Sequence, residues 1–124
     1  NESLKIPELH HKYFRIFSDE KLKLVRMYSK QKELRRLKWL YYTGKLDQET
    51  LENLEWHVFE LDIKKNRSDL EMFIESDKDI LELVEKISYQ KEKIEYLESI
   101  IKSLNTRGFQ IKNAIEWKRF TMGT

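Results

Sequence analysis

The sequence has no cysteine, only one proline and three glycines among its 124 residues. Without cysteine, the chain has no disulfide bond and no thiolate chemistry, which fits a reducing compartment. So few turn and helix-breaking residues predict an all-α protein. The chain also lacks an apolar run long enough to span a bilayer and a signal-like N-terminal region, so no membrane association is expected.

Residues that bind metals or catalyse reactions are equally scarce. The chain has three histidines, and His10 and His11 are adjacent, so on a helix they would point to different faces. A zinc site is therefore not expected. A nuclease needs clustered carboxylates to hold Mg²⁺, but Asp77 and Asp79 are too close in sequence to share a helix face. We expect no metal, no cofactor and no enzymatic activity.

Charge is distributed unevenly along a chain that is long enough for one domain at most. Residues 1–46 carry 12 Lys/Arg against 5 Asp/Glu, residues 47–100 carry 7 against 16, and residues 101–124 carry 5 against 1. This pattern predicts a polyanion site in a basic region and an acidic surface elsewhere. The chain begins with Asn1 rather than Met, so we expect that an N-terminal piece has been removed.

The dominant pattern is a row of positions spaced alternately by three and four residues between Ile80 and Ile115. Nine of its eleven positions are Ile or Leu, and Gln90 and Gly108 are the exceptions. A 3.5-residue period over five heptads predicts a helix, about 50 Å long, that packs along a seam against another helix. Asn105 and Gly108 are poor helix formers, so one alternative is a break of the helix at residues 105–108. We favour a continuous or mildly kinked helix, because the heptad phase continues unchanged through Gly108.

This seam has two possible partners. One is another helix of an ordinary bundle within the same chain. The other is a copy of the same helix, which we favour because we expect a single domain of this size to have too little chain to cover so long a helix from end to end. We therefore expect a homo-oligomer. The residues predicted to hold its subunits together are Ile87, Ile94, Leu97, Ile101, Leu104, Gly108, Ile111 and Ile115.

Helix-start and helix-stop signals divide the single predicted domain, residues 1–124, into segments. Ser18 and Asp19 suit a helix start, and Gly44 suits a helix end. Asp47 suits the start of a second helix, and either Ser76 or Asp77 suits the start of the long helix. The predicted segments are an irregular or short helical lead-in (1–18), a basic helix (19–46), a short helix with a connecting segment (47–76) and the long helix (77–120).

The sequence RRLKWLYYTGK at residues 35–45 interleaves cations with aromatic side chains. Single-stranded nucleic acid requires this combination, because cations neutralise phosphates and aromatic faces stack on unpaired bases. The alternative is that Trp39 and Tyr41 are core residues and that the cations form a solvated edge. The predicted nucleic-acid-binding residues are Lys32, Arg35, Arg36, Lys38, Trp39, Tyr41, Tyr42 and Lys45.

Three segments resemble the UvsY family of phage recombination mediators: RRLKWLYYTGK at 35–45, ESDKDIL at 75–81, and TRGFQIKNAIEWKRF at 106–120. The resemblance covers about residues 25–122. It places the family's DNA-contacting basic positions on Arg36 and Lys38, and its oligomerising helix on the long C-terminal helix. Leu40 departs from the family pattern, in which an acid is expected.

The resemblance also implies a function. It implies a protein of the host bacterial cytoplasm that binds single-stranded DNA as a homo-oligomeric ring, a hexamer or heptamer. Such a ring would load a RecA-like phage recombinase onto strands covered by the phage single-strand-binding protein, without cofactor or catalysis. The competing function is that of a structural coiled-coil adaptor that binds protein partners and no DNA. That function accounts for the heptads but leaves the cluster at residues 35–45 unexplained.

Overall fold

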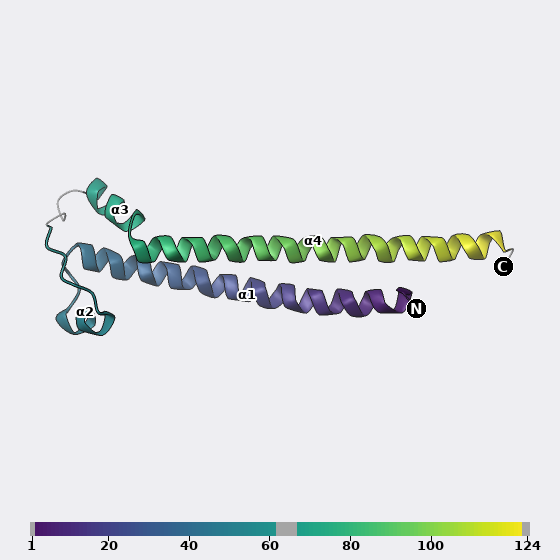
Figure 1. The fold of residues 1–124 in the computed structure, drawn as a ribbon, viewed down its shortest axis with the longest axis horizontal. Helices are drawn as coiled ribbons and strands as arrows, with labels where there is room; N and C mark the ends of the chain where they lie inside the picture. Colours follow the sequence, from purple (N-terminus) through teal and green to yellow (C-terminus); the bar gives the residue numbers. More distant parts are fainter. Residues whose placement is uncertain (1, 62–66, 123–124) are drawn as a thin grey trace. The chain divides into compact units, whose positions relative to one another are not determined.

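The computed structural model describes residues 2–61 and 67–122, and all regular structure in these ranges is helical. The helices are α1 (Glu2–Tyr42), α2 (Gln48–Leu54), α3 (Arg67–Glu75) and α4 (Lys78–Thr121) (Figure 1). The prediction of an all-α fold with a long C-terminal helix is confirmed. None of the described helices combines the length and the apolar character needed to cross a membrane.

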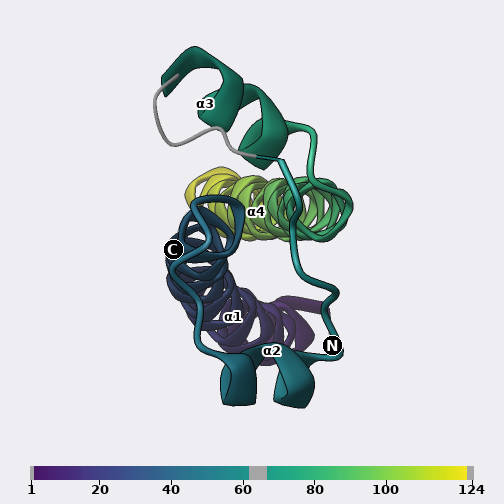
Figure 2. The same ribbon diagram turned by 90° about the vertical axis from the view of Figure 1, so that its left-hand side faces the viewer.

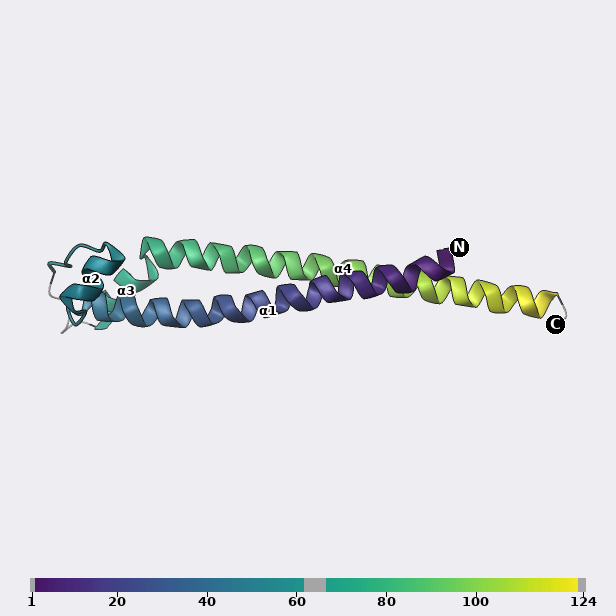
Figure 3. The same ribbon diagram turned by 90° about the horizontal axis from the view of Figure 1, so that it is seen from below.

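Contacts within the chain define two compact units. One unit comprises Asn1–Leu24 and Tyr89–Thr124, and the other comprises Val25–Ser88. In the first unit, the N-terminal part of α1 packs against the C-terminal part of α4 (Figure 3). The second unit contains the rest of both long helices, with α2 and α3 on opposite sides of the pair (Figure 2).

Helix α1 begins much earlier than predicted. The expected lead-in over residues 1–18 is wrong, because α1 starts at Glu2 and continues through Ser18 without a break. Even Pro7, which lacks a backbone N–H, is accommodated in its second turn. The predicted basic helix is therefore the C-terminal part of a 41-residue helix.

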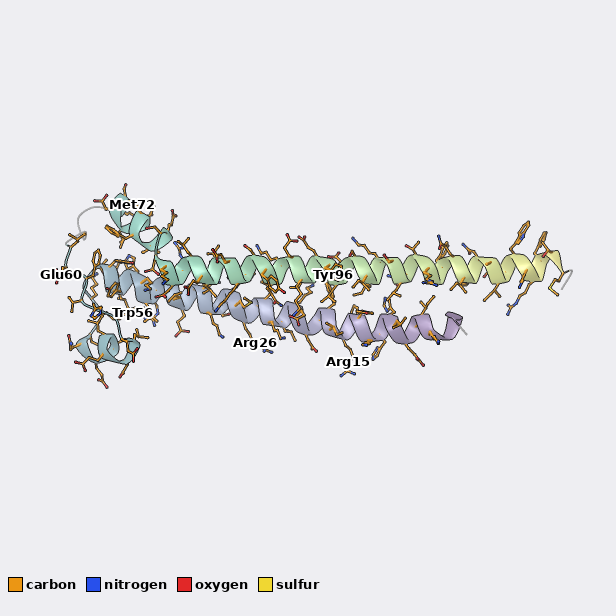
Figure 4. The ribbon with its side chains drawn as sticks, in the orientation of Figure 1. Arg15, Arg26, Trp56, Glu60, Met72 and Tyr96 are labelled. Carbon is orange, nitrogen blue, oxygen red and sulfur yellow. The ribbon has the colours of Figure 1, made fainter. Side chains whose placement is uncertain are left out.

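A second 3.5-residue seam explains why α1 is so long. Its positions alternate by three and four residues, and each of them is buried or half-buried. They are Ile6, His10, Tyr13, Phe17, Glu20, Leu24, Met27, Gln31, Leu34 and Lys38. Four of these positions carry polar side chains, so the repeat cannot be recognised from apolar residues alone. Arg15 and Arg26, which lie off this seam, point away from α4 (Figure 4).

The seam of α4 packs against α1 of the same chain, so the expectation that this seam is free is wrong. Ile80, Ile87, Ile94 and Leu97 are at most 9% exposed. One chain covers more of the seam than expected, because its first 18 residues extend α1 along α4. A role for the α4 seam in assembly stays a prediction.

The polar seam residue Gln90 also has its partner within the chain. Its amide Nε2 donates hydrogen bonds to the backbone oxygen of Glu20, at 2.9 Å, and to Glu20 Oε2, at 2.6 Å. Lys93 adds an ion pair to Glu20 Oε1 at 3.1 Å. The hydrogen bond from Gln90 is the largest cause of a lowered pKa of Glu20, and it outweighs the opposing effect of burial. These bonds satisfy both polar groups inside an otherwise apolar seam.

The predicted helix ends are largely correct. Gly44 has a φ of 71°, and its N–H donates to Tyr41 O while that of Lys45 donates to Leu40 O, the pattern of a Schellman cap. Asp47 caps α2 through a hydrogen bond from the Thr50 N–H. The connecting segment, for which a further helical turn was an alternative, contains the nine-residue helix α3. Residues 62–66 of this segment lie outside the described residues. Helix α4 runs through Gly108 unbroken.

A small apolar core holds α3 in the second unit. Leu70 and Ile74 of α3 are buried together with Ile80, at the start of α4. Leu34 and Tyr42 of α1 pack against this cluster, as do Phe59 and Phe73. This core fixes α3 next to the C-terminal part of α1, which carries the predicted nucleic-acid-binding residues.

Candidate nucleic-acid interface

One face of α1 carries half of the predicted binding residues. A helix turns about 100° per residue, so positions 32, 35, 36 and 39 all fall within roughly one third of its circumference. The side chains of Lys32, Arg35 and Arg36 are exposed, and Trp39 is 40% exposed. Three cations and a large aromatic ring thus face solvent together.

Helix α3 adds a second wall to this face. Arg35, Arg36 and Trp39 border a groove of about 320 Å³ whose other side is formed by α3. The α3 residues lining it are Arg67, Leu70, Glu71 and Ile74. The groove is therefore lined by three arginines, by the apolar or aromatic side chains of Trp39, Leu70 and Ile74, and by one carboxylate, that of Glu71. Cations beside an aromatic ring suit a strand with a charged backbone and flat bases.

Arg67 was missed by the sequence analysis. It is 92% exposed and approaches Glu71 at 3.9 Å, so this ion pair is long and solvated and contributes little to stability. Arg67 also lies in the first turn of α3, where the helix dipole disfavours a cation. The sequence did contain a signal that Arg67 is a candidate binding residue. It is a basic residue at an unfavourable helix start, inside the acidic middle of the chain.

Trp39 combines packing with exposure. The ammonium of Lys45 lies 4.6 Å from the centre of its ring, within the range of a cation–π contact. Lys45 itself is exposed, so the structure places a further cation beside the aromatic ring. Because the ring is partly buried and partly exposed, its environment does not decide between core packing and base stacking, and the role of Trp39 stays a prediction.

Lys38 points away from the groove. Its side chain is only 6% exposed, and its Nζ lies 3.1 Å from Asp77 Oδ2 and 2.7 Å from Asp79 Oδ2. The same ammonium lies 3.8 Å from the centre of the Trp56 ring. Trp56 lies in the segment that follows α2 and is labelled in Figure 4. Lys38 is therefore already paired with two carboxylates, and a phosphate would have to compete with them for its ammonium group.

The two tyrosines of the predicted site also have partners inside the chain. The hydroxyl of Tyr41 donates to the backbone oxygen of His57, and its ring packs edge-on against Trp56 at 5.3 Å. The hydroxyl of Tyr42 donates to Asp77 Oδ2 at 2.6 Å, and its ring contacts Phe73. Burial, followed by the hydrogen bond to Asp77, raises the pKa of Tyr42, so the phenol stays protonated.

Asp77 and Asp79 come closer together than the sequence analysis assumed. Asp77 precedes the first residue of α4, and its Oδ1 accepts hydrogen bonds from the N–H groups of Asp79, at 2.9 Å, and Ile80, at 3.1 Å. As a capping residue it is free of the helical repeat, so both carboxylates converge on Lys38. The expectation that these two carboxylates cannot come together is therefore wrong. The cation that lies between them is the ammonium of Lys38. Among the described residues, no group of three or more His, Cys, Asp or Glu side chains could hold a metal ion.

The predicted site thus separates into two sets with different surroundings. Lys32, Arg35, Arg36 and Trp39 border or adjoin the groove. Lys38, Tyr41 and Tyr42 instead line a second cavity of about 460 Å³, together with Trp56 and the acids at the start of α4. The DNA contacts of both sets stay predictions.

Comparison with known proteins agrees with the resemblance. The family model described as "Recombination, repair and ssDNA binding protein UvsY" matches residues 1–124. The crystal structure of the bacteriophage T4 recombination mediator protein UvsY has a similar fold, with a TM-score of 0.71 and 19% sequence identity over 96% of this chain and 82% of that chain. No curated protein matches. Because the family model matches the whole sequence, the chain belongs to the UvsY family of recombination, repair and single-stranded-DNA-binding proteins.

Proposed function

We propose that this chain is a recombination mediator that binds single-stranded DNA in the groove between α1 and α3. The observation that carries the proposal is the arrangement of Arg35, Arg36 and Arg67 around one groove beside the half-exposed ring of Trp39. The arginines would neutralise phosphates, and Trp39 would stack on a base. The family description and the fold of the T4 protein support this function.

Binding to a fluorescein-labelled oligothymidylate, measured by fluorescence anisotropy over a range of KCl concentrations, tests the groove. Arg35→Ala combined with Arg36→Ala should flatten the plot of log affinity against log salt by about 0.7 for each lost phosphate contact. Lys30→Ala is the matched control, because Lys30 is an exposed cation on the opposite side of α1. If both variants flatten the plot equally, binding depends on overall charge and not on this groove.

The contribution of Trp39 can be separated from that of the arginines. If Trp39 stacks on a base, Trp39→Ala should weaken binding by about 1–3 kcal/mol and leave the salt slope unchanged. If Trp39 is mainly a core residue, the melting temperature should fall and binding by the folded protein should be preserved. A melting curve followed by circular dichroism, recorded for the same samples, distinguishes these results.

The proposal includes assembly into a homo-oligomeric ring, a hexamer or heptamer. Its support lies at the C-terminal end of α4, where Ile115 and the large side chains of Phe109, Trp117 and Phe120 are exposed. An Ile111→Asp, Ile115→Asp variant should sediment as smaller species with its helix content retained, whereas Asn113→Asp, on another face of α4, should not. A full-size oligomer from the double variant would exclude this end of α4 as the subunit contact.

The last part of the proposal is that the ring promotes loading of a RecA-like phage recombinase onto DNA covered by single-strand-binding protein. Loading can be measured as recombinase ATPase activity on coated DNA, with and without this protein. We expect a shorter lag before steady-state hydrolysis, and a longer lag with the Arg35→Ala, Arg36→Ala variant. If the protein assembles but binds no oligonucleotide even at low salt, the function is that of a protein-binding adaptor.

A further inference from the structure

The contacts of Lys38 suggest a role that differs from phosphate binding. An ammonium group has three N–H donors. In this structure the ammonium lies between two carboxylates, at 2.7 Å and 3.1 Å, and also lies 5.5 Å from the centre of the Tyr41 ring and 3.8 Å from that of Trp56. Moving it to a DNA phosphate would leave the buried Asp77 carboxylate without its cation, which is strongly unfavourable.

Asp77 connects three elements of the second unit. It caps α4 through its Oδ1, and through its Oδ2 it accepts the Tyr42 hydroxyl and pairs with Lys38, both from α1. It also follows α3 directly, after the turn at Ser76. Burial alone would raise the pKa of Asp77, but the hydrogen bonds from Tyr42, Ile80 and Lys38 outweigh it and lower the pKa. Asp77 is therefore charged at neutral pH, and it holds the junction of α3 and α4 to the end of α1.

The same junction determines where the second wall of the groove lies. Arg67 reaches the groove from α3, whose buried residues Leu70 and Ile74 are shared between the groove and the core. The α1 wall carries Arg35 and Arg36, one turn or less from Lys38. The ion pair and the groove therefore depend on the same placement of α3 against α1.

We infer that Lys38 is a positioning residue of the DNA site, which with Asp77 and Tyr42 holds the α3 wall and Arg67 opposite Arg35 and Arg36, and that it does not contact DNA itself. This inference rests on the proposed DNA-binding function. It assigns to the acidic pair at the start of α4 an indirect role in binding a polyanion.

The two roles of Lys38 predict opposite effects for Asp77→Asn. If Lys38 contacts phosphate, removing the neighbouring acid should free the ammonium and tighten binding to the labelled oligothymidylate. If Lys38 positions α3, Asp77→Asn should weaken binding by roughly three- to tenfold, a typical coupling between groups in one network, although an acid is removed. Glu75→Gln is the matched control, because it removes an exposed acid from α3 outside this network. It should leave affinity unchanged or raise it slightly.

Three further variants keep the test informative if Asp77→Asn folds poorly. Tyr42→Phe removes one hydrogen bond to Asp77 without changing charge, and it should weaken binding in the same direction. Lys38→Met should weaken binding by the same factor as Asp77→Asn, and the double variant of Lys38 and Asp77 should be no weaker than either single variant. All affinities are measured well below the melting transition of each variant, which circular dichroism defines.

If Lys38 and Asp77 only stabilised the fold, Asp77→Asn would not change how much Arg67 contributes to DNA binding. Arg67→Gln should lower affinity and flatten the salt slope in the wild-type background, but it should have little further effect in the Asp77→Asn background, because the α3 wall is already displaced. An equal effect of Arg67→Gln in both backgrounds, or tighter binding by Asp77→Asn, would overturn the inference. A wild-type protein that does not bind the oligonucleotide contradicts the proposed function instead, and the two failures are thereby distinct.

Discussion

The two ends of the α4 seam have the same sequence pattern but different surroundings. Between Ile80 and Leu97 the seam residues are buried except for the half-buried Leu83, and Ile80 is only 2% exposed. From Ile101 onward they are half-buried, and Ile115 is 40% exposed. A cavity of about 330 Å³, bordered by Ile6, Pro7 and Ile111 among others, lies beside this second stretch. A heptad repeat thus specifies that a helix has a partner, but not how completely that partner covers it.

The difference follows from the antiparallel pairing in the first unit. Ile6 of α1 lies opposite Gly108, since a Cβ added to Gly108 would be 3.4 Å from Ile6 Cγ2. Only about one turn of α1 precedes Ile6, whereas α4 continues to Thr121. Within the described residues, the end of α4 therefore extends past α1 (Figure 1). This end also carries the exposed side chains of Trp117 and Phe120.

The largest effect should come from truncating a buried seam residue and comparing it with an exposed one. Ile94→Ala should cost about 2–5 kcal/mol of unfolding free energy, because it leaves a cavity between α1 and α4. Ile115→Ala, with the same change of side chain, should cost less than about 1 kcal/mol in the monomer, since Ile115 already faces water in part. Urea unfolding followed by circular dichroism at low protein concentration measures both values.

Equal costs for these two variants would remove the distinction between the two ends of the seam. A cost for Ile115→Ala that appears only at high protein concentration would mean that assembly buries this residue. The concentration dependence therefore serves as the control.

The long helix was predictable because its signal is local and repeated. Its apolar period, a capping residue at Ser76 or Asp77 and the unchanged phase at Gly108 are all visible in the residues themselves. The partner in α1 was not predicted, because polar side chains such as His10, Glu20 and Lys38 occupy seam positions where apolar residues are expected. Their compatibility with burial depends on partners far away in the sequence, which periodicity cannot reveal.

The candidate site shows the same limit. The composition of residues 35–45 indicated a nucleic-acid site, and the helical period would already have placed Lys38 on a different face from Arg36. What the sequence could not supply was the identity of its partners, since Asp77 and Asp79 lie 39 and 41 positions away. Arg67 was missed for the same reason, because α3 reaches the groove only through the core packing of Leu70 and Ile74.

The second prediction changes the polar contact in the well-covered part of the seam. Gln90→Leu should cost about 1–3 kcal/mol, because it leaves the buried carboxylate of Glu20 without a hydrogen-bond donor at its Oε2. Replacing both Glu20 and Gln90 by Leu should recover much of this loss, since no polar group is then left unsatisfied. Urea unfolding of the two variants checks this order. If the double variant is less stable than Gln90→Leu, the contact between Lys93 and Glu20 matters more than the hydrogen bonds.

The third prediction concerns the pH dependence that Glu20 confers on the same region. Its pKa is lower in the folded protein than its ordinary value, so its stabilising contribution is present at neutral pH and is lost as the pH falls through the folded-state pKa. Glu20→Gln should therefore flatten the decline of melting temperature between about pH 5 and pH 3. Glu98→Gln, which alters an exposed acid of α4, is the control and should flatten it less. The same slope in both variants would show that overall charge causes the acid sensitivity.

The smallest expected effect is at Gly108, in the loosely covered part of the seam. A glycine inside a helix costs about 0.5–1 kcal/mol relative to alanine, and the added methyl group would lie 3.4 Å from the Cγ2 methyl of Ile6, an ordinary contact distance. Gly108→Ala should therefore stabilise the monomer by roughly that amount, as measured by urea unfolding at low protein concentration. Asn105→Ala, at an exposed position of the same helix, controls for helix propensity alone. A net loss of stability for Gly108→Ala would mean that the helices need the close approach that only glycine allows. A gain in the monomer together with a loss of assembly would instead place a second copy against Gly108.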